Sequence, residues 1–426
     1  MPQFFNENEM RDFLFNNYSE TFYALIKGQK ATVQWDADEF PPIRFWIQQT
    51  TEKRINEILD ELRNLVLEGK EVRLERASDS TTRVDLLGHP VEGTGLTIIE
   101  LKKSTQTERQ AFTELLAYAN HFCGLFPYLS EDCIFSVLIA PMKSRTVRDA
   151  YFQELVTNGK NTIALIPPKS CDDSFSLEVY YPDERYYKWI ENKILDDSAF
   201  ITVVASFPEI KGWIDTDRDN EGQPPAHSVE ALNAVALVVV QKLEAAGLHG
   251  MVYGRQLWGE IASVLPNPNS IVVSVLNPFN NVGDMAEERT AEIQAIVDQL
   301  NEGDTWLEML KSGFDGRIIR LVQESFDISF LQSKQQSVRP EISLPDWGSF
   351  KTSMLEAVTC HNFDLFMTGM IREIYHAYIK HIYKTGFDDI YYADDLPKFS
   401  YGTLNEFLPI WEIIRRLSLS EEKEME

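Results

Sequence analysis

Short apolar runs alternate with helical patterns in the first part of the chain, and this alternation limits the folds that the chain can adopt. The apolar residues recur at the spacing of a helix or of a strand. The expected order is helix 8–27, helix 51–67, strands 71–76, 82–88 and 96–102, helix 107–126, strand 132–141, helix 145–155 and strand 161–168. We therefore predict an α/β (α+β) fold with a mixed central sheet flanked by helices.

The chain of 426 residues is long enough for two or three domains of roughly 100–200 residues each. Polar, proline-containing stretches at 211–228 and 333–347 are the expected breaks. The expected domains are 1–205 with the sheet and an N-terminal helical extension, 228–333 with an α/β accessory unit, and 346–426 with helices. Residues 254–277 read as helix, turn and strand, which is consistent with a winged-helix-like accessory unit.

The net charge of −26 argues against a protein coated in basic surface for nucleic acid or anionic membrane, but not against a local basic groove. The four cysteines include no CxxC pair, which fits a reducing cytoplasm. The N-terminus lacks the features of a signal peptide, and the apolar run 231–240 is about half of a membrane span. We expect a cytoplasmic protein without a membrane partner. Because the chain has no GxxxxGK[ST] motif, we also expect no nucleotide cofactor.

The strand at 96–102, "LTIIELK", ends in charged residues although its start is apolar. Side chains alternate along a strand, so Glu100 and Lys102 share one face and Leu101 points to the other. Asp85 stands 15 residues before Glu100, in the preceding strand. If the two strands pair as a hairpin, the carboxylates of Asp85 and Glu100 meet near one end of the sheet.

Two neighbouring carboxylates resist joint ionisation, and a divalent cation removes that penalty. Mg²⁺ prefers oxygen ligands, keeps several waters and accepts phosphate oxygens, and Mn²⁺ is expected to substitute for it. A lysine beside the cation can hold or deprotonate the attacking water, and can neutralise charge on a phosphate. Asp85, Glu100 and Lys102 therefore form a candidate apparatus for phosphodiester hydrolysis.

The pattern Asp85, Glu100, Leu101, Lys102 in this order of elements resembles the PD-(D/E)xK nuclease superfamily, with its restriction-endonuclease-like and RecB-type cores. The resemblance covers roughly residues 50–170. It implies that Asp85 and Glu100 bind the metal with help from the Leu101 carbonyl, and that Lys102 acts on the water or the phosphate. It also implies that Gln110, on the following helix, supports the site. Val84 departs from the family's proline, and Tyr118 lies eight residues after Gln110, where the RecB-type pattern has four.

Other residues have both a functional and an ordinary interpretation. Glu57 and Glu61 either add a carboxylate or face solvent beside Lys53 and Arg54. Tyr118 either serves the site or packs its helix. The basic residues near the site in sequence either contact phosphate or belong to an ordinary charged surface: Lys103, Arg109, Lys143, Arg145 and Arg148. His89 follows the Asp85 strand and is read as a loop histidine rather than a ligand.

Three functions remain open from the sequence. The first is a Mg²⁺-dependent nuclease acting on nucleic acid, with DNA as the expected substrate. As a restriction or anti-phage defence effector, it would use its C-terminal half to sense a signal or bind a partner, and a protein partner or homo-oligomer would offset its acidic charge. The second is a nuclease-fold binding or assembly subunit of a larger defence or repair complex. The third is a metal hydrolase for a smaller phosphate substrate.

Overall fold

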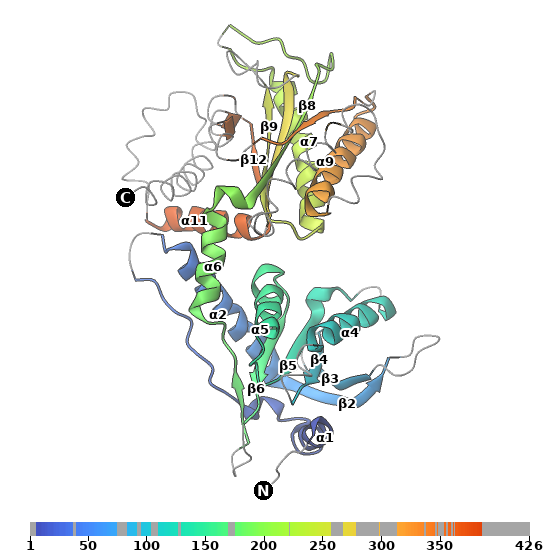
Figure 1. Ribbon diagram of the computed structural model, residues 1–426, viewed down its shortest axis with the longest axis vertical. Coiled ribbons are helices and arrows are strands. Elements are labelled where there is room, and N and C mark those ends of the chain that lie inside the picture. The colour runs from blue at the N-terminus through green and yellow to red at the C-terminus, as the bar shows by residue number, and fades with distance from the viewer. Residues whose placement is uncertain are drawn as a thin grey trace. The chain divides into compact units, whose positions relative to one another are not determined.

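The computed structural model places two compact units, Met1–Trp189 and Ile190–Glu426, and each is considered by itself (Figure 1). The structure describes residues 6–36, 40–74, 83–91, 95–103, 110–126, 129–168, 175–220, 222–256, 267–277, 298, 313–335, 338–345, 347, 353–354, 357–358, 361 and 363–385. Both units combine helices with a sheet, so the chain is a mixed α/β protein, as the sequence predicts. None of the described helices is long and apolar enough to cross a membrane.

The first unit is built on a seven-stranded mixed sheet with the order β1-β7-β6-β5-β4-β3-β2. Its strands are β1 (Ile26–Lys27), β2 (Leu65–Arg73), β3 (Arg83–Pro90), β4 (Leu96–Leu101), β5 (Ile134–Ile139), β6 (Thr162–Ile166) and β7 (Leu177–Val179). β2, β3 and β4 pair antiparallel, whereas β4, β5 and β6 pair parallel. β4 therefore stands where the sheet changes direction, with an antiparallel neighbour on one side and a parallel one on the other.

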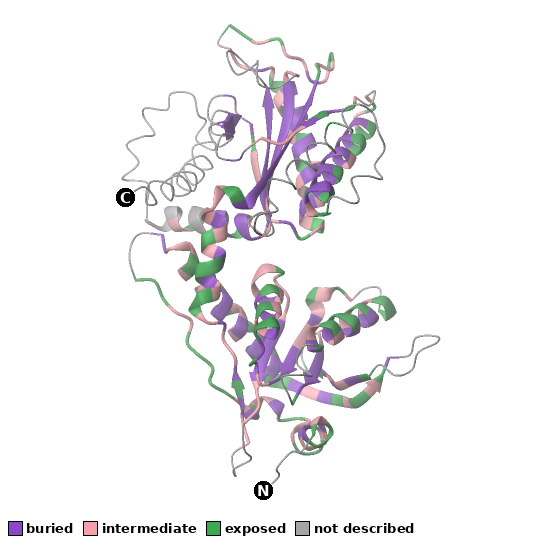
Figure 2. Ribbon diagram, in the orientation of Figure 1, coloured by how far each residue is buried: buried purple, intermediate pink, exposed green. Residues whose placement is uncertain are grey.

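The helices of the first unit are α1 (Glu7–Tyr18), α2 (Ile43–Glu61), α4 (Ala111–Leu125) and α5 (Arg145–Phe152), with a π-helical turn at Gln153–Thr157 and short 3₁₀ turns at Phe22–Leu25, Leu62–Asn64 and Glu131–Cys133. Helix α6 (Glu184–Leu195) contains the division between the units, after Trp189. α1 packs against β2 and β3, α4 against β4 and β5, and α5 against β6. The central strands are buried, as the purple ribbon of Figure 2 shows. Their apolar side chains form one core with α1, α2, α4 and α5.

Local sequence explains how α1 begins. Asn6 caps the helix, and its side chain accepts a hydrogen bond from the Glu9 backbone N–H at 2.8 Å. Glu7 and Glu9 lie in the first turn, where a negative charge is favoured by the helix dipole. Met10 and Leu14 are buried one turn apart on one face, so the helix is fixed to the sheet by one apolar stripe.

The second unit contains a five-stranded sheet with the order β11-β8-β10-β9-β12. Its elements are a 3₁₀ turn (Asp197–Ala199), β8 (Phe200–Phe207), α7 (Ala226–Ala245), β9 (Gly250–Gln256), β10 (Asn269–Leu276), α9 (Gly313–Gln332), β11 (Glu341–Ser343), β12 (Leu365–Thr368) and α11 (Gly369–Thr385). All neighbouring strands in it pair antiparallel. β8 connects through α7 to β9, and β10 lies between these two strands in the sheet. In the same way, β10 connects through α9 to β11, with β8 between them. Two split βαβ crossovers of this kind are the pattern of ferredoxin-like βαββαβ units. β12 extends this sheet beside β9.

The domain boundaries differ from those expected from the sequence. The units divide at Trp189 and Ile190, and β8 (200–207) belongs to the second sheet. The polar stretch 211–228 lies between β8 and the first turn of α7, inside one βαβ crossover that also contains an Ile210–Ile214 bridge. Residues 228–333 and 346–426 fall in one unit rather than two. Proline and polar composition marks a loop, and a loop does not always separate domains.

The helix expected at the start of the winged-helix-like segment 254–277 is not formed by its described residues. Gly254, Arg255 and Gln256 continue strand β9 and pair with β10, so no helix begins at Gly254. Residues 257–266 lie outside the described part of the chain. The strand is favoured because each of these three residues is buried beside the neighbouring strand β10. The expected helical region 346–426 likewise contributes β12 to the sheet before α11 begins.

Candidate functional site

The pairing of β3 with β4 sets the position of Asp85 relative to Glu100. Leu86 pairs with Ile99 and Leu87 with Ile98, so the next position places Asp85 opposite Glu100. The backbone N–H of Leu101 donates to Asp85 Oδ2 at 2.9 Å, so the aspartate side chain accepts a hydrogen bond from the neighbouring strand. The predicted meeting of the two carboxylates at one end of the sheet is therefore present.

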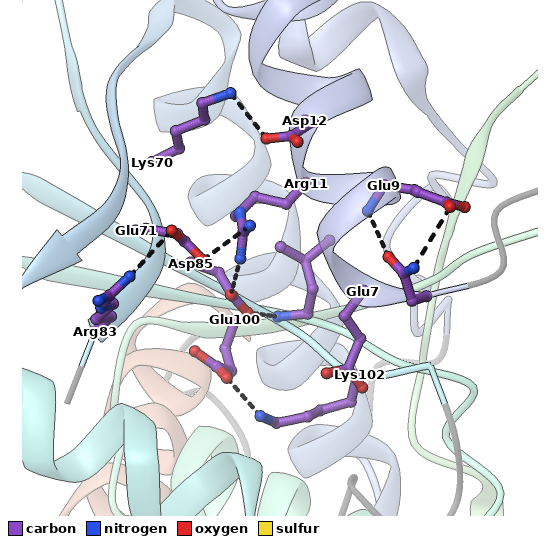
Figure 3. A network of polar contacts seen from close by, with 12 residues as sticks. Glu7, Glu9, Arg11, Asp12, Lys70, Glu71, Arg83, Asp85, Glu100 and Lys102 are labelled. Atoms are coloured by element: carbon purple, nitrogen blue, oxygen red, sulfur yellow. Dashed lines mark hydrogen bonds and ion pairs between the residues drawn. The ribbon is translucent and has the colours of Figure 1, made fainter. Parts of the chain in front are cut away.

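Lys102 lies on the same side of β4 as Glu100. Its Nζ is 2.6 Å from Glu100 Oε1. Figure 3 marks this contact with a dashed line. Its backbone N–H continues the parallel ladder by donating to the Ile139 carbonyl at 2.8 Å. The side chains of Lys102 and Glu100 are 9% and 4% exposed, so this ion pair is buried. The polar end of the apolar strand is thus a buried lysine–glutamate contact, and not a solvated strand end.

Helix α4 adds Glu114 and Tyr118 to the site. A Glu114 oxygen, Oε2, lies 2.6 Å from Lys102 Nζ, close enough for an ion pair although not aligned as a hydrogen bond. The Tyr118 hydroxyl is buried with the carboxylates and donates to the Arg83 carbonyl at 2.8 Å. Gln110, the residue expected to support the site, is exposed at the N-terminus of α4. Glu114, one helical turn further along, contacts Lys102 instead.

Arg11 of α1 is a member of this cluster that the sequence did not indicate. Its guanidinium lies 3.4 Å from Asp85 Oδ1 and 3.0 Å from Glu71 Oε1 (Figure 3). Glu71 in turn lies 3.1 Å from Arg83. Arg11 and Asp85 are 74 residues apart, and an arginine on an amphipathic helix carries no motif. Only the docking of α1 on β2 and β3 brings Arg11 to the site.

Burial and crowding of like charges dominate the electrostatics. Burial, followed by the charge of Asp85, raises the pKa of Glu100 well above its ordinary range. Burial also raises the pKa of Asp85, against the opposing effects of the Leu101 N–H, Lys102 and Arg11. Burial alone would lower the pKa of Lys102, but Glu100 and Glu114 beside it outweigh burial, and the net pKa is raised. The lysine therefore stays protonated between Glu100 and Glu114.

The ligands available for a cation are few. Glu100 Oε2 is buried and has no hydrogen-bond partner, so one carboxylate oxygen of the site remains available. Asp85 stands opposite on β3 with its Oδ1 oxygen bound only weakly, at 3.4 Å from Arg11. Among the described residues, no group of three or more His, Cys, Asp or Glu side chains is arranged to hold a metal ion. Such a donor set fits Mg²⁺, which keeps several waters, and does not fit a structural zinc site.

The remaining candidate residues have ordinary surroundings or lie elsewhere. Exposed Glu57 pairs with Lys53 at 3.6 Å, and Glu61 is also exposed. His89 pairs with Glu68 at 3.1 Å on the surface. The basic residues are not gathered at the carboxylates: Arg145 pairs with Asp149, Arg148 donates to the Met142 and Lys143 carbonyls, and Lys103 is exposed. Arg109 lies outside the described residues.

Comparisons with known proteins identify no relative of this chain. No protein-family model matches the chain, and no curated protein or solved structure is significantly similar to it. The functional inference therefore depends on the site itself.

Proposed function

We propose that the first unit is a Mg²⁺-dependent nuclease that hydrolyses phosphodiester bonds in nucleic acid, with DNA as the expected substrate. The observation that carries the proposal is the cross-strand pair of Asp85 and Glu100, with a buried, unpartnered Glu100 oxygen and Lys102 on the same side. The strand order around β4 supports a PD-(D/E)xK type of core, since the antiparallel strands precede a parallel one. Mn²⁺ is expected to replace Mg²⁺.

In this proposal, Asp85 and Glu100 would hold the cation, with the Leu101 carbonyl as a third protein ligand. A bound Mg²⁺ supplies a Lewis acid that activates water and stabilises charge on the phosphate. Lys102 is protonated, because two carboxylates surround it, so its part is to donate a hydrogen bond to phosphate or water rather than to remove a proton. Glu114 pairs with the ammonium group and holds it beside Glu100.

The resemblance to restriction and RecB-type cores extends the proposal to a role in restriction or anti-phage defence. The second unit, with its own sheet and core, would then sense a signal or bind a protein partner. A net charge of −26 makes binding to bulk DNA unfavourable, so a partner or a homo-oligomer would complete the nucleic-acid surface.

One observation favours a second candidate, a nuclease-fold binding or assembly subunit. Asp85 and Glu100 each pair with a cation of the chain itself, Arg11 and Lys102 respectively. A site that is internally neutralised in this way can persist without metal or catalysis. The two candidates make opposite predictions for nucleic-acid cleavage.

The deciding experiment is cleavage of supercoiled plasmid, linear duplex, single-stranded DNA and RNA with Mg²⁺ or Mn²⁺. We expect Glu100→Gln to remove cutting without unfolding the protein, because Gln keeps the shape but loses the metal ligand. Glu57→Gln, which changes an exposed carboxylate of α2, is the matched control and should cut normally. If wild type and Glu100→Gln cut equally, the nuclease site is elsewhere or the activity is a contaminant. If none cuts and none binds Mn²⁺, the assembly subunit is favoured.

A further inference from the structure

Helix α1 is fixed to the site by contacts at several points. The backbone N–H of Lys103, just after β4, donates to Glu7 Oε1 at 2.9 Å. Asp12 pairs with Lys70 of β2 at 2.8 Å. Beyond the helix, the Leu67 N–H donates to the Ser19 carbonyl at 2.8 Å. With its apolar stripe also buried, α1 holds Arg11 at a defined place and not as a mobile surface side chain.

The Arg11 side chain is only 8% exposed, whereas its partners lie progressively further out: Asp85 is 19% and Glu71 is 42% exposed. The guanidinium is thus the most buried member of a chain of ion pairs that runs from Arg83 through Glu71 and Arg11 to Asp85. Burying a guanidinium is unfavourable unless carboxylates surround it. Arg11 is therefore placed here by the negative charge of the strands.

The negative charge comes from three carboxylates, Glu71, Asp85 and Glu100, which lie in a row across β2, β3 and β4. Lys70 pairs with Leu86 and Val72 with Val84, so the intervening register places Glu71 opposite Asp85, just as Asp85 stands opposite Glu100. β2 departs from regular geometry here: Glu71 has a φ of 47°, a left-handed conformation that is rare for glutamate. Three carboxylates on neighbouring strands are held together by one guanidinium and one ammonium group.

We propose that Arg11 is a built-in counter-ion of Asp85, a positioning residue that weakens the binding of a divalent cation at Asp85 and Glu100. This inference rests on the proposed nuclease function. Without metal, the guanidinium neutralises the Glu71–Asp85 end of the row. A divalent cation bound at Asp85 would be repelled by the positive charge of Arg11, which contacts the same carboxylate. Because α1 stays docked, Arg11 would not move away and the repulsion would remain. The negative charge of a substrate phosphate would offset the added positive charge. The affinity for the cation would therefore rise when substrate binds.

The test is calorimetric titration of the full-length protein with Mn²⁺, without nucleic acid, at pH 8. We expect Arg11→Met to bind Mn²⁺ roughly tenfold more tightly than wild type, because the variant keeps the buried stem and removes the charge. Arg11→Lys keeps the charge and should bind about as wild type does. Lys53→Met, which removes an exposed lysine of α2, controls for net charge and should also behave as wild type. The rise in melting temperature on adding Mn²⁺ is the second readout, and it should be largest for Arg11→Met.

The outcomes separate this inference from the proposed function. If wild type binds Mn²⁺, Glu100→Gln does not, and Arg11→Met binds equally or more weakly, the counter-ion role is refuted while the metal site stands. If only Arg11→Met binds, the counter-ion role is supported in its strongest form. If no variant binds Mn²⁺, the metal site fails and the counter-ion role fails with it. Should Arg11→Met not fold, Arg11→Gln, which retains a hydrogen-bond partner for Glu71, takes its place with the same expected direction.

Discussion

At the residue scale, the raised pKa of Glu100 makes the stability of the fold depend on pH. Burial and the charge of Asp85 raise the pKa of Glu100 to about 9 from an ordinary value of 4.5. Between these values the folded protein retains a proton that the unfolded chain releases. The free energy of unfolding must therefore fall as pH rises through this window.

We expect the melting temperature of the metal-free protein to fall between pH 5 and pH 9 more steeply than that of Glu100→Gln. Glutamine is neutral throughout, so the variant lacks this proton. Calorimetry in the presence of a chelator measures both slopes. Mg²⁺ should displace the proton and flatten the wild-type slope, which can be checked as proton release in a weakly buffered titration. Parallel slopes for the two proteins would show that Glu100 is already ionised in the metal-free fold.

Lys102 gives the second prediction at this scale. Lys102→Ala should still bind Mn²⁺ but should cut more slowly by a factor on the order of 10² or more, because a group that stabilises charge on the reacting phosphate is lost. Single-turnover cleavage and Mn²⁺ titration of the same preparation measure the two effects separately. Lys53→Ala, at an exposed position of α2, is the control. Normal cutting by Lys102→Ala would refute the role given to this residue.

At the scale of elements, the close contact of β3 with β2 supports the position of Asp85. Gly88 of β3 has no room for a side chain, because a Cβ there would lie 2.5 Å from the Val66 carbonyl oxygen of β2. This glycine lets the backbones approach three residues from Asp85. The hairpin that carries the carboxylates therefore depends on a residue with no chemical role.

We expect Gly88→Ala to destabilise the first unit by about 1–3 kcal/mol, the usual effect of overpacking, and to weaken Mn²⁺ binding by shifting β3. Gly124→Ala in α4 is the matched control: apart from its chain neighbours and the nearby backbone of its own helix, no atom lies within 4 Å of the added Cβ. This control should be neutral, or stabilising by up to about 1 kcal/mol. Denaturant unfolding followed by Mn²⁺ titration tests both variants. Equal stability of the two would contradict the close contact between the strands.

Most of the site-bearing elements were predictable because their contacts are local in sequence. The antiparallel hairpin joins β3 to β4 through a short connection, and periodicity then indicates which face carries Asp85, Glu100 and Lys102. Arg11 and Glu71 were not predictable, because their roles depend on docking α1 and on an irregular position in β2. Gln110 was chosen by resemblance, and the turn of α4 instead presents Glu114 to the lysine.

At the scale of the whole molecule, the second unit shows where sequence reasoning fails. β8 and β11 pair with each other although Ser206 and Glu341 are 135 residues apart. Split βαβ crossovers place each new strand beside a strand that is not its sequence neighbour, so periodicity reveals the elements but not their order. The composition of 211–228 then suggested a domain boundary inside a single crossover. The fold class of the chain was predictable, and the organisation of its second unit was not.

The docking of α1 also has a consequence for the way the protein is made. α1 leaves the ribosome before β3 and β4: Asp85 is synthesised 74 residues later than Arg11, and Lys103, just after β4, 96 residues later than Glu7. Contacts of such sequence separation form late, because a long loop must be closed first. A nascent chain therefore carries the helix long before it carries the carboxylates. The row of Glu71, Asp85 and Glu100 can then assemble only when the helix that carries Arg11 is already present.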